Sequence, residues 1–268
     1  MQLNPWRRGR KIYKLVLAAL VILLLSPIVI HAADSQLLWL VNRENPLSST
    51  YRPQNLTTHQ GVTLRREARE AYLSMEAAMK ADGIQNLRLL SAYRPYNHQK
   101  AIFSQRVKEL EATHTRAQAT EKAARSVQPP GASEHQLGLA LDVTTNGKLT
   151  QAFGSTPAGQ WLADNCHRYG FIIRYPAAHT QTTRIMYEPW HLRYVGVPHA
   201  AIMQAENLPL EAYGDYMKAA QMYVFWGEGE YHLLSYSDPP PQDGADFSSV
   251  NPGKTGYIIT RVKPRPRV

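Results

Sequence analysis

The sequence predicts a mixed α+β fold, with a central domain between an apolar N-terminal segment and a small β-rich appendage. Apolar residues repeat at helical spacing in several segments, most clearly over residues 64–81. Between these segments lie short apolar runs such as 171–175, which are typical of buried strands. Beyond residue 222, aromatic strand-like runs alternate with Pro-, Ser- and Gly-containing linkers. We therefore divide the chain into an N-terminal segment at 1–33, a domain at 34–221 and an appendage at 222–268.

Residues 1–33 predict a signal peptide or a signal anchor. Five basic residues and no acidic one precede residue 15, and an apolar run follows from Leu15 to Ile30. A positive head followed by such a run is typical of an export signal. The run is slightly short for a membrane span of about 20 residues, and Ala32-Ala33 is an imperfect cleavage site. Both forms stay open, and either one predicts an exported domain whose positive flank stays cytoplasmic.

The remaining elements each have a local signal. Gly83 is a natural stop for the first helix, and Thr156 followed by Pro157 is typical of a helix N-cap and first position. In chain order we expect an extended segment and loop up to 60, a helix at 64–81, a strand at 87–90, helices from about 96 and over about 120–125, a strand at 139–144, a helix from 157 to Gly170, strands at 171–175 and 190–195 joined by a polar loop, a short helix after Pro198, a helix at 210–220, and appendage strands at 223–226, 231–236 and 256–262.

Composition excludes several classes of site. The 268 residues are 44% hydrophobic and 19% charged, which is ordinary for a globular protein. Cys166 is the single cysteine, so an intrachain disulfide, a four-thiolate zinc site and an iron–sulfur cluster are all impossible. Much of the +9 net charge comes from the N-terminal head, and no basic, aromatic-interleaved patch follows. We therefore expect no nucleic-acid binding, and any metal must be held by histidine and carboxylate.

The stretch Ser133–Asp142 contains a first pair of candidate metal ligands. His135 and Asp142 are separated by Gly138 and by an apolar run, Leu139–Leu141, that leads into the carboxylate. A lone carboxylate at the end of a buried strand costs several kcal/mol or shifts its pKa. A cation would remove that cost, and histidine and aspartate are plausible zinc ligands. A loop in which His135 and Asp142 only hydrogen-bond each other stays open as the alternative.

A second motif, Glu188-Pro189-Trp190-His191, supplies a third ligand and a base. Pro189 and the β-prone residues after it favour a loop that enters a strand. A catalytic zinc takes three protein ligands and one water, and it lowers the pKa of that water to about 7 while polarising the scissile carbonyl. His191 would complete the ligand set. Glu188 would then take the proton from the water and return it to the leaving amine.

Arg94 closes a strand and is followed by a helix, a position from which it can hold a substrate carboxylate or an oxyanion. A structural salt bridge is the alternative reading of this residue. Six further histidines lack a carboxylate in a comparable strand–loop setting, and we expect them on the surface or in packing roles: His98, His114, His167, His179, His199 and His232.

These motifs occur together in a recognisable order: Ser91-Ala92-Tyr93-Arg94, Ser133-x-His135-x-x-Gly138-x-Ala140-x-Asp142 and Glu188-Pro189-Trp190-His191-Leu192-Arg193-Tyr194-Val195-Gly196. With them, the chain over about 37–220 resembles the VanY-type D-alanyl-D-alanine carboxypeptidases, zinc peptidases related to VanX and to the hedgehog fold. The resemblance implies a central, mainly antiparallel sheet flanked by helices. It also implies that zinc is bound by His135, Asp142 and His191. Glu188 would be the catalytic base. The substrate pocket would be lined by Arg94, Gln99 and Ser133.

The implied activity is a zinc-dependent removal of the terminal D-alanine from peptidoglycan stem peptides, with D,D- and L,D-specificity both open. One alternative is a peptidoglycan endopeptidase with the same site. Another is a non-catalytic wall-binding module with a structural zinc, although such a site has no use for the free carboxylate of Glu188. We expect a monomer that contacts the cytoplasmic membrane through its N-terminal segment, on the extracytoplasmic face, or a secreted or periplasmic form.

Overall fold

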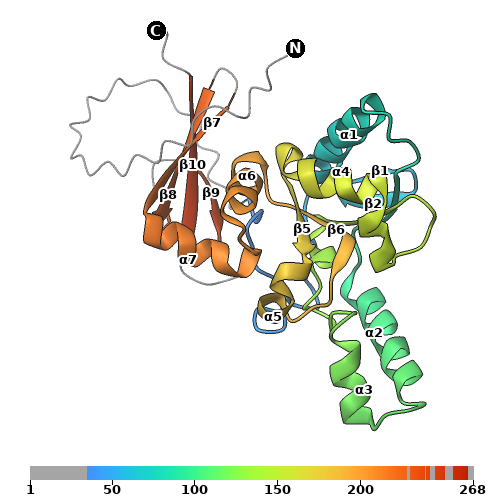
Figure 1. The fold of residues 1–268 in the computed structure, drawn as a ribbon. Coiled ribbons are helices and arrows are strands. Elements are labelled where there is room, and N and C mark those ends of the chain that lie inside the picture. Colours follow the sequence, from blue (N-terminus) through green and yellow to red (C-terminus); the bar gives the residue numbers. More distant parts are fainter. Residues whose placement is uncertain (1–34, 228–229, 239, 242–244, 251–255, 265–268) are drawn as a thin grey trace.

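A computed structural model describes residues 35–227, 230–238, 240–241, 245–250 and 256–264 (Figure 1). The predicted signal or anchor at 1–33 lies outside these residues. Within the described part of the chain, no helix is long and apolar enough to cross a membrane.

The domain is built on a four-stranded antiparallel sheet, which confirms the mainly antiparallel central sheet that the resemblance implied. Its strands lie in the order β3 (Arg88–Ser91), β4 (Ala140–Thr144), β6 (Glu188–Tyr194) and β5 (Phe171–Tyr175). Side chains alternate between the two faces of a strand. One face of this sheet is therefore apolar and packs into a core, while the other face carries polar residues.

Two helices cover the apolar face. These are α1 (Arg66–Ala81) and α4 (Pro157–Asn165), and their buried side chains share one core with those of β3, β4 and β5. As predicted, Thr156 caps α4, because its side chain accepts a hydrogen bond from the backbone N–H of Gly159. The packing of this layer leaves the opposite face of the sheet free to form a site.

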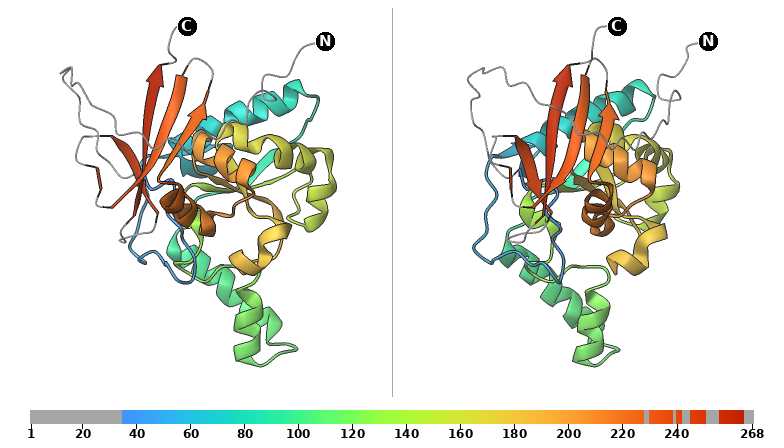
Figure 2. Two further views of the ribbon diagram at one scale, coloured as in Figure 1. Left: turned by 60° about the vertical axis from the view of Figure 1, so that its left-hand side comes forward. Right: turned by 90° about the vertical axis from the view of Figure 1, so that its left-hand side faces the viewer.

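The helices α2 (Tyr96–Leu110) and α3 (Arg116–Ala123) form a hairpin that projects away from the sheet (Figures 1 and 2). The prediction placed the second of these helices over about 120–125, which is wrong by one turn at its start. Thr115 and Gln118 form a capping box there. This polar start signal decides the boundary, and the prediction did not take it into account.

A β-hairpin precedes α1, where the sequence predicted a loop and the start of a helix at residue 64. It consists of β1 (Leu56–His59) and β2 (Val62–Arg65). Gln60 and Gly61 both have positive φ, as a two-residue turn between twisted strands requires. Leu64 fits the apolar spacing of the helix, but it belongs to β2 because it pairs with Thr57 of β1.

The connection between β5 and β6 contains short helical turns rather than only a polar loop, and β6 begins at Glu188 instead of Trp190. Among the described residues, the short helical elements are the 3₁₀ turns η2 (Glu134–Leu137), η3 (Gln151–Ser155), η4 (Cys166–Tyr169) and η5 (Ala177–His179), and the helix α5 (Thr180–Thr183).

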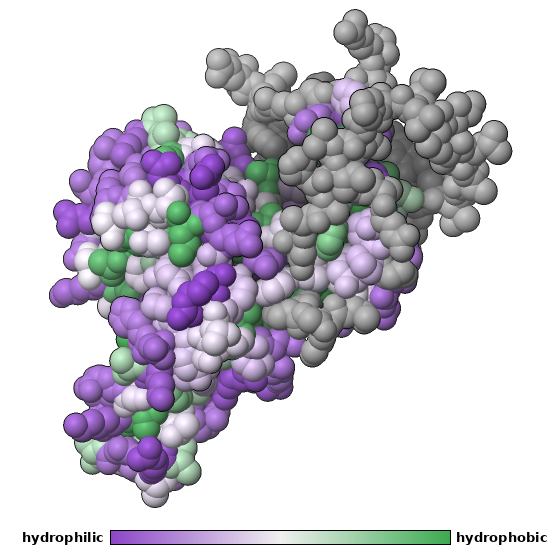
Figure 3. All heavy atoms as spheres, turned by 180° about the vertical axis from the view of Figure 1, so that it is seen from behind, coloured by the Kyte–Doolittle hydropathy of each residue, from purple (hydrophilic) through white to green (hydrophobic). Residues whose placement is uncertain are grey.

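The C-terminal part contains α6 (Val197–Glu206), α7 (Leu210–Ala220) and a second sheet. The strands of this sheet lie in the order β7 (Met222–Trp226), β8 (Glu230–Ser237), β10 (Tyr257–Pro264) and β9 (Asp246–Ser249). The sequence did not predict β9, because its serine-rich residues read as a linker and only pairing with β10 makes them a strand. The sheet shares a core with α6, α7 and Leu38 of the N-terminal extended segment. Viewed from behind, the described surface is mainly hydrophilic with scattered apolar groups (Figure 3).

Candidate active site

Two strands of the central sheet bring an aspartate and a histidine together. Asp142 of β4 and His191 of β6 are direct cross-strand partners, and Asp142 Oδ1 lies 3.3 Å from His191 Nδ1. Their neighbours Leu141 and Leu192 are fully buried in the chain. The period of two along each strand therefore separates a core-facing pair of leucines from a site-facing pair of polar residues.

His135 reaches the same point from the turn η2, just before β4. Gly138 ends this turn with a φ of 71°, a left-handed conformation that favours glycine. The Nδ1–H of His135 donates to the carbonyl oxygen of Ala92 at 2.6 Å. This bond leaves Nε2 facing Asp142, with 3.3 Å between Nε2 and Oδ2.

The three side chains fit a metal ion. One ligand atom from each lies within 4.8 Å of the others, and all three residues are buried. Within the described residues, Asp142 Oδ1 is buried without a well-formed hydrogen bond, although His191 Nδ1 lies 3.3 Å away. Burying a carboxylate oxygen in this way is costly unless a cation occupies the space. Two imidazoles and a carboxylate are a zinc ligand set with room for a fourth ligand. The bond from His135 to a carbonyl is the support that metal-binding histidines ordinarily have.

For Asp142 and His135, the electrostatics agree with this donor set. Burial opposes ionisation of Asp142, but the imidazoles of His135 and His191 hold its pKa well below the ordinary range. Burial lowers the pKa of His135, which keeps this imidazole neutral, as metal binding requires. For His191 burial acts in the same direction, but the carboxylates of Asp142 and Glu188 raise its pKa overall.

Glu188 lies beside these residues at the start of β6. Its Oε2 is 3.7 Å from His191 Nδ1, although residues three apart in a regular strand face opposite sides. The pairing of β5 with β6 is irregular at this segment, because Ile173 pairs with Leu192 and Tyr175 pairs with Glu188, which leaves extra residues in β6. Such a bulge re-aims side chains and permits the arrangement. Burial, assisted by Asp142, raises the pKa of Glu188 to about 7, against the opposing effects of His191 and Arg94. A carboxyl group with such a pKa can both accept and donate a proton near neutral pH.

Arg94 is held at the edge of the site. Its guanidinium donates to Gln99 Oε1 at 2.7 Å and to Ser91 Oγ at 3.1 Å, and it lies 3.6 Å from Asp142 Oδ2. Gln99 is itself fixed, because its amide donates to the carbonyl of Gln128 at 2.5 Å. These contacts pre-position a cationic fork next to the candidate metal ligands.

All seven predicted site residues line one cavity of about 450 Å³. The structure thus assembles residues that lie almost a hundred positions apart in the sequence. The roles given to them remain predictions. His179, in contrast, is not among the residues that line the cavity and instead contacts Asn207.

Several residues of the cavity wall were not predicted. Tyr175 ends β5, and its ring centre lies 5.0 Å from that of His191. Trp190, which belongs to the hydrophobic core, also lines the cavity, as do Ile102 and Arg106 of α2. The i, i+3, i+7 spacing of Gln99, Ile102 and Arg106 places them on one face of a helix, and this spacing could have predicted that Ile102 and Arg106 line the cavity together with Gln99.

A family model described as VanY, D-alanyl-D-alanine carboxypeptidase, matches residues 61–197. The putative carboxypeptidase YodJ of Bacillus subtilis is 40% identical over 195 residues, which cover 68% of this chain and 68% of that protein. The D-alanyl-D-alanine carboxypeptidase of Enterococcus faecium is 35% identical over 174 residues, or 62% of this chain and 51% of that protein. The chain thus spans between half and about two thirds of the length of these relatives.

Solved structures are similar as well. The LD-carboxypeptidase LdcB superposes with a TM-score of 0.59 at 38% identity, over 67% of this chain and 86% of LdcB. A mutant of the vancomycin-resistance D,D-pentapeptidase VanY in complex with Zn(II) has a TM-score of 0.59 at 36% identity, over 66% of this chain and 98% of that one.

Proposed function

Since the chain belongs to the VanY family of D-alanyl-D-alanine carboxypeptidases and is a zinc metallocarboxypeptidase, we propose that it removes the terminal D-alanine from peptidoglycan stem peptides. The observation that carries this proposal is the buried group of His135, Asp142 and His191, whose ligand atoms lie within 4.8 Å of one another. Glu188 and Arg94 line the same cavity. The carboxylate of Glu188, as a base, and the guanidinium of Arg94, as a group that can bind a carboxylate, therefore flank one metal centre.

The proposed ligands are His135, Asp142 and His191, and Glu188 is the proposed base. Bound zinc would supply Lewis-acid polarisation of the scissile carbonyl and lower the pKa of a water to about 7. Glu188 accepts the proton of the attacking water and delivers it to the leaving amine. Its pKa of about 7 suits both transfers, because efficient acid–base catalysis requires a pKa near the working pH.

Arg94 is proposed to bind the terminal carboxylate of the substrate, with Gln99 and Ser133 completing the pocket. Its hydrogen bonds to Gln99 and Ser91 hold the guanidinium in place before substrate arrives. A substrate that ends in a free carboxylate would gain a charge-assisted pair, whereas an internal peptide bond offers no such charge. This difference favours a carboxypeptidase over an endopeptidase.

The decisive assay uses the full chain, purified in detergent, with tetrapeptide and pentapeptide stems. Release of D-alanine is followed by mass spectrometry, with and without a chelator. Release from the pentapeptide alone identifies a D,D-carboxypeptidase, and release from the tetrapeptide alone identifies an L,D-carboxypeptidase. A zinc-loaded chain that releases D-alanine from neither stem would sink the proposal, and cleavage of cross-linked muropeptides instead would identify an endopeptidase.

We further propose that the domain at 34–221 works outside the cytoplasmic membrane, as a monomer, with the appendage at 222–268 attached. The cationic and apolar leader at 1–33 supports export, and the substrate lies on that side. Cell fractionation and the intact mass of the extracted protein test this placement and distinguish a cleaved signal from an anchor. A cytoplasmic protein with an intact leader would contradict it, and light scattering of the purified chain tests the monomer.

A further inference from the structure

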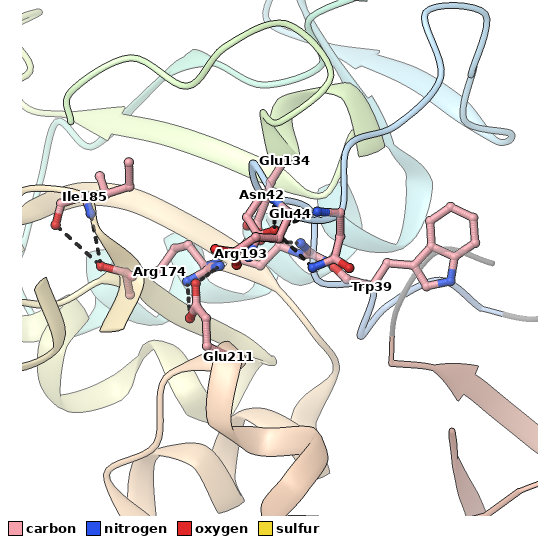
Figure 4. A network of polar contacts seen from close by, with 10 residues as sticks. Trp39, Asn42, Glu44, Glu134, Arg174, Ile185, Arg193 and Glu211 are labelled. Atoms are coloured by element: carbon pink, nitrogen blue, oxygen red, sulfur yellow. Dashed lines mark hydrogen bonds and ion pairs between the residues drawn. The ribbon is translucent and has the colours of Figure 1, made fainter. Parts of the chain in front are cut away.

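Four charged residues form a buried network (Figure 4), and one of them, Glu134, directly precedes the candidate ligand His135. Arg174 of β5 donates from Nη1 and Nη2 to both carboxylate oxygens of Glu211 on α7, at 2.9 and 2.7 Å. Its Nε donates to Glu134 Oε1 at 2.8 Å. Arg193 of β6 forms an ion pair with the same oxygen of Glu134 at 3.0 Å. Three of the four side chains are at most 1% exposed, and Glu211 is 13% exposed.

The charges in this network balance. Two guanidinium groups face two carboxylates, and an unpaired charge in such a buried place would be costly. Burial opposes the charged form of Arg174, but the carboxylates of Glu134 and Glu211 hold its pKa well above the ordinary value. Without Glu211, Arg174 and Arg193 would share the single carboxylate of Glu134. The network would then carry a net positive charge close to a site for a divalent cation.

Two short routes lead from Arg174 to the candidate ligands. Glu134 immediately precedes His135 and begins the turn η2 that carries it. On the other side, the Arg174 guanidinium lies over the Tyr175 ring at 4.8 Å, and the Tyr175 ring lies 5.0 Å from that of His191. A shift of Arg174 would therefore disturb both histidines, whose rings are themselves 4.9 Å apart.

We propose that Glu211 is a positioning residue of the metal centre, which holds His135 and His191 in place through Arg174. The inference rests on the proposed zinc site. It extends that site to α7, which lies beyond the residues 61–197 that match the family model. The alternative is that Glu211 only fastens α7 to the sheet, in which case its loss would lower stability without changing the affinity for zinc.

The test compares full-length Glu211→Gln and Glu211→Asp with the control Glu76→Gln. Glu76 on α1 is a matched carboxylate, since it is 11% exposed and pairs with Lys80 at 2.9 Å. Zinc dissociation constants are measured by competition with a chromophoric chelator, and unfolding temperatures are measured on the zinc-free chains. The d–d absorption of the cobalt-substituted chains reports on the geometry of the centre.

We expect Glu211→Gln to weaken zinc binding about 10- to 100-fold, the range for residues that support metal ligands, and to change the cobalt spectrum. Glu211→Asp keeps the charge but is shorter, and it should show a smaller loss. Glu76→Gln should lower the unfolding temperature while zinc affinity stays within about 2-fold of the wild type, since Glu76 pairs with Lys80 and sites without shared partners act almost independently.

An unchanged zinc affinity and cobalt spectrum in Glu211→Gln would overturn the inference. If that variant does not fold, an unchanged affinity in Glu211→Asp would do so, because the two-pronged contact with Arg174 would then have no effect on the metal. His191→Ala separates this failure from a failure of the proposed function. If His191→Ala binds zinc as tightly as the wild type, the proposed zinc site itself is wrong. If His191→Ala loses zinc while the Glu211 variants keep it, the zinc site stands and only the role of Glu211 is refuted.

Discussion

Asp142 and His191 face each other across neighbouring strands, with 3.3 Å between Oδ1 and Nδ1. This single pairing places a carboxylate from one motif against an imidazole from another motif about fifty positions later. His135 then approaches Asp142 from the opposite oxygen, at 3.3 Å from Oδ2. The carboxylate of Asp142 is therefore the group that connects the two candidate histidine ligands.

The first prediction concerns Asp142. Asp142→Asn keeps the shape of the side chain but removes the charge that stabilises a bound cation. Zinc affinity should fall by more than the roughly 10- to 100-fold typical of residues that only support a ligand. Metal content by mass spectrometry and chelator competition measure the effect. Asp164→Asn, at an exposed position of α4, is the control and should retain zinc; equal zinc content in both variants would refute the ligand role.

Glu188→Ala should separate metal binding from turnover. Glu188 is not among the three ligands of the candidate site, so zinc content should stay at the level of the wild type. Loss of the base should lower kcat by about 10²- to 10⁴-fold. The measurement is D-alanine release by the zinc-loaded variant. A variant with a near-normal kcat would remove Glu188 from its assigned role, and one without zinc would make it a ligand instead.

Arg94→Lys tests recognition of the terminal carboxylate. Lysine keeps the charge but loses the planar fork, so kcat/KM for a stem peptide should fall about 10- to 100-fold, as expected for a lost charged hydrogen bond. Arg106→Lys is the control, since Arg106 lines the same cavity but is 42% exposed and pairs with Glu109. A stem peptide amidated at its C-terminus should be a poor substrate for the wild type and should be affected little by Arg94→Lys. Equal losses on both substrates would argue against carboxylate binding.

We expect the contacts of His199 on α6 with α7 and β10 to make the stability of the protein sensitive to acid. His199 Nδ1 lies 2.9 Å from the Tyr213 hydroxyl on α7, and His199 Nε2 lies 3.4 Å from Thr260 Oγ1 on β10. Burial, assisted by His232, lowers the pKa of His199 to about 3. Because the unfolded chain binds the proton more readily, the contribution of neutral His199 is fully present above about pH 6.5. It is lost as the pH falls below that value, down to the folded pKa.

At pH 5 this loss should amount to about 2 kcal/mol of the free energy of unfolding. Urea unfolding at pH 7.5 and pH 5 measures it. His199→Gln cannot titrate and should lose about 2 kcal/mol less than the wild type over that interval. His98→Gln, at an exposed position of α2, should behave like the wild type. The same pH dependence in the wild type and His199→Gln would contradict the assignment.

Local signals in the sequence predicted much of the fold. The helix at 210–220 and the strand at 171–175 coincide with α7 and β5, because their apolar periodicity and their flanking residues agree. The hairpin of β1 and β2 was not predicted, since Leu64 satisfies both a helical and a strand pattern. Only pairing with Thr57 selects the strand. The strand β9 was missed for the same reason, because its polar residues become a strand through their partner.

The sequence by itself determined the chemical groups of this protein: two histidines, an aspartate, a glutamate and an arginine, which stand in three short motifs. Those choices depend on neighbours a few positions away, so the motifs reveal them. The tertiary structure alone decided that Asp142 pairs with His191 and that Glu211 reaches Arg174 from α7. Such contacts join distant segments, and their energy comes from packing and charge balance in the buried interior, which no local pattern of residues records.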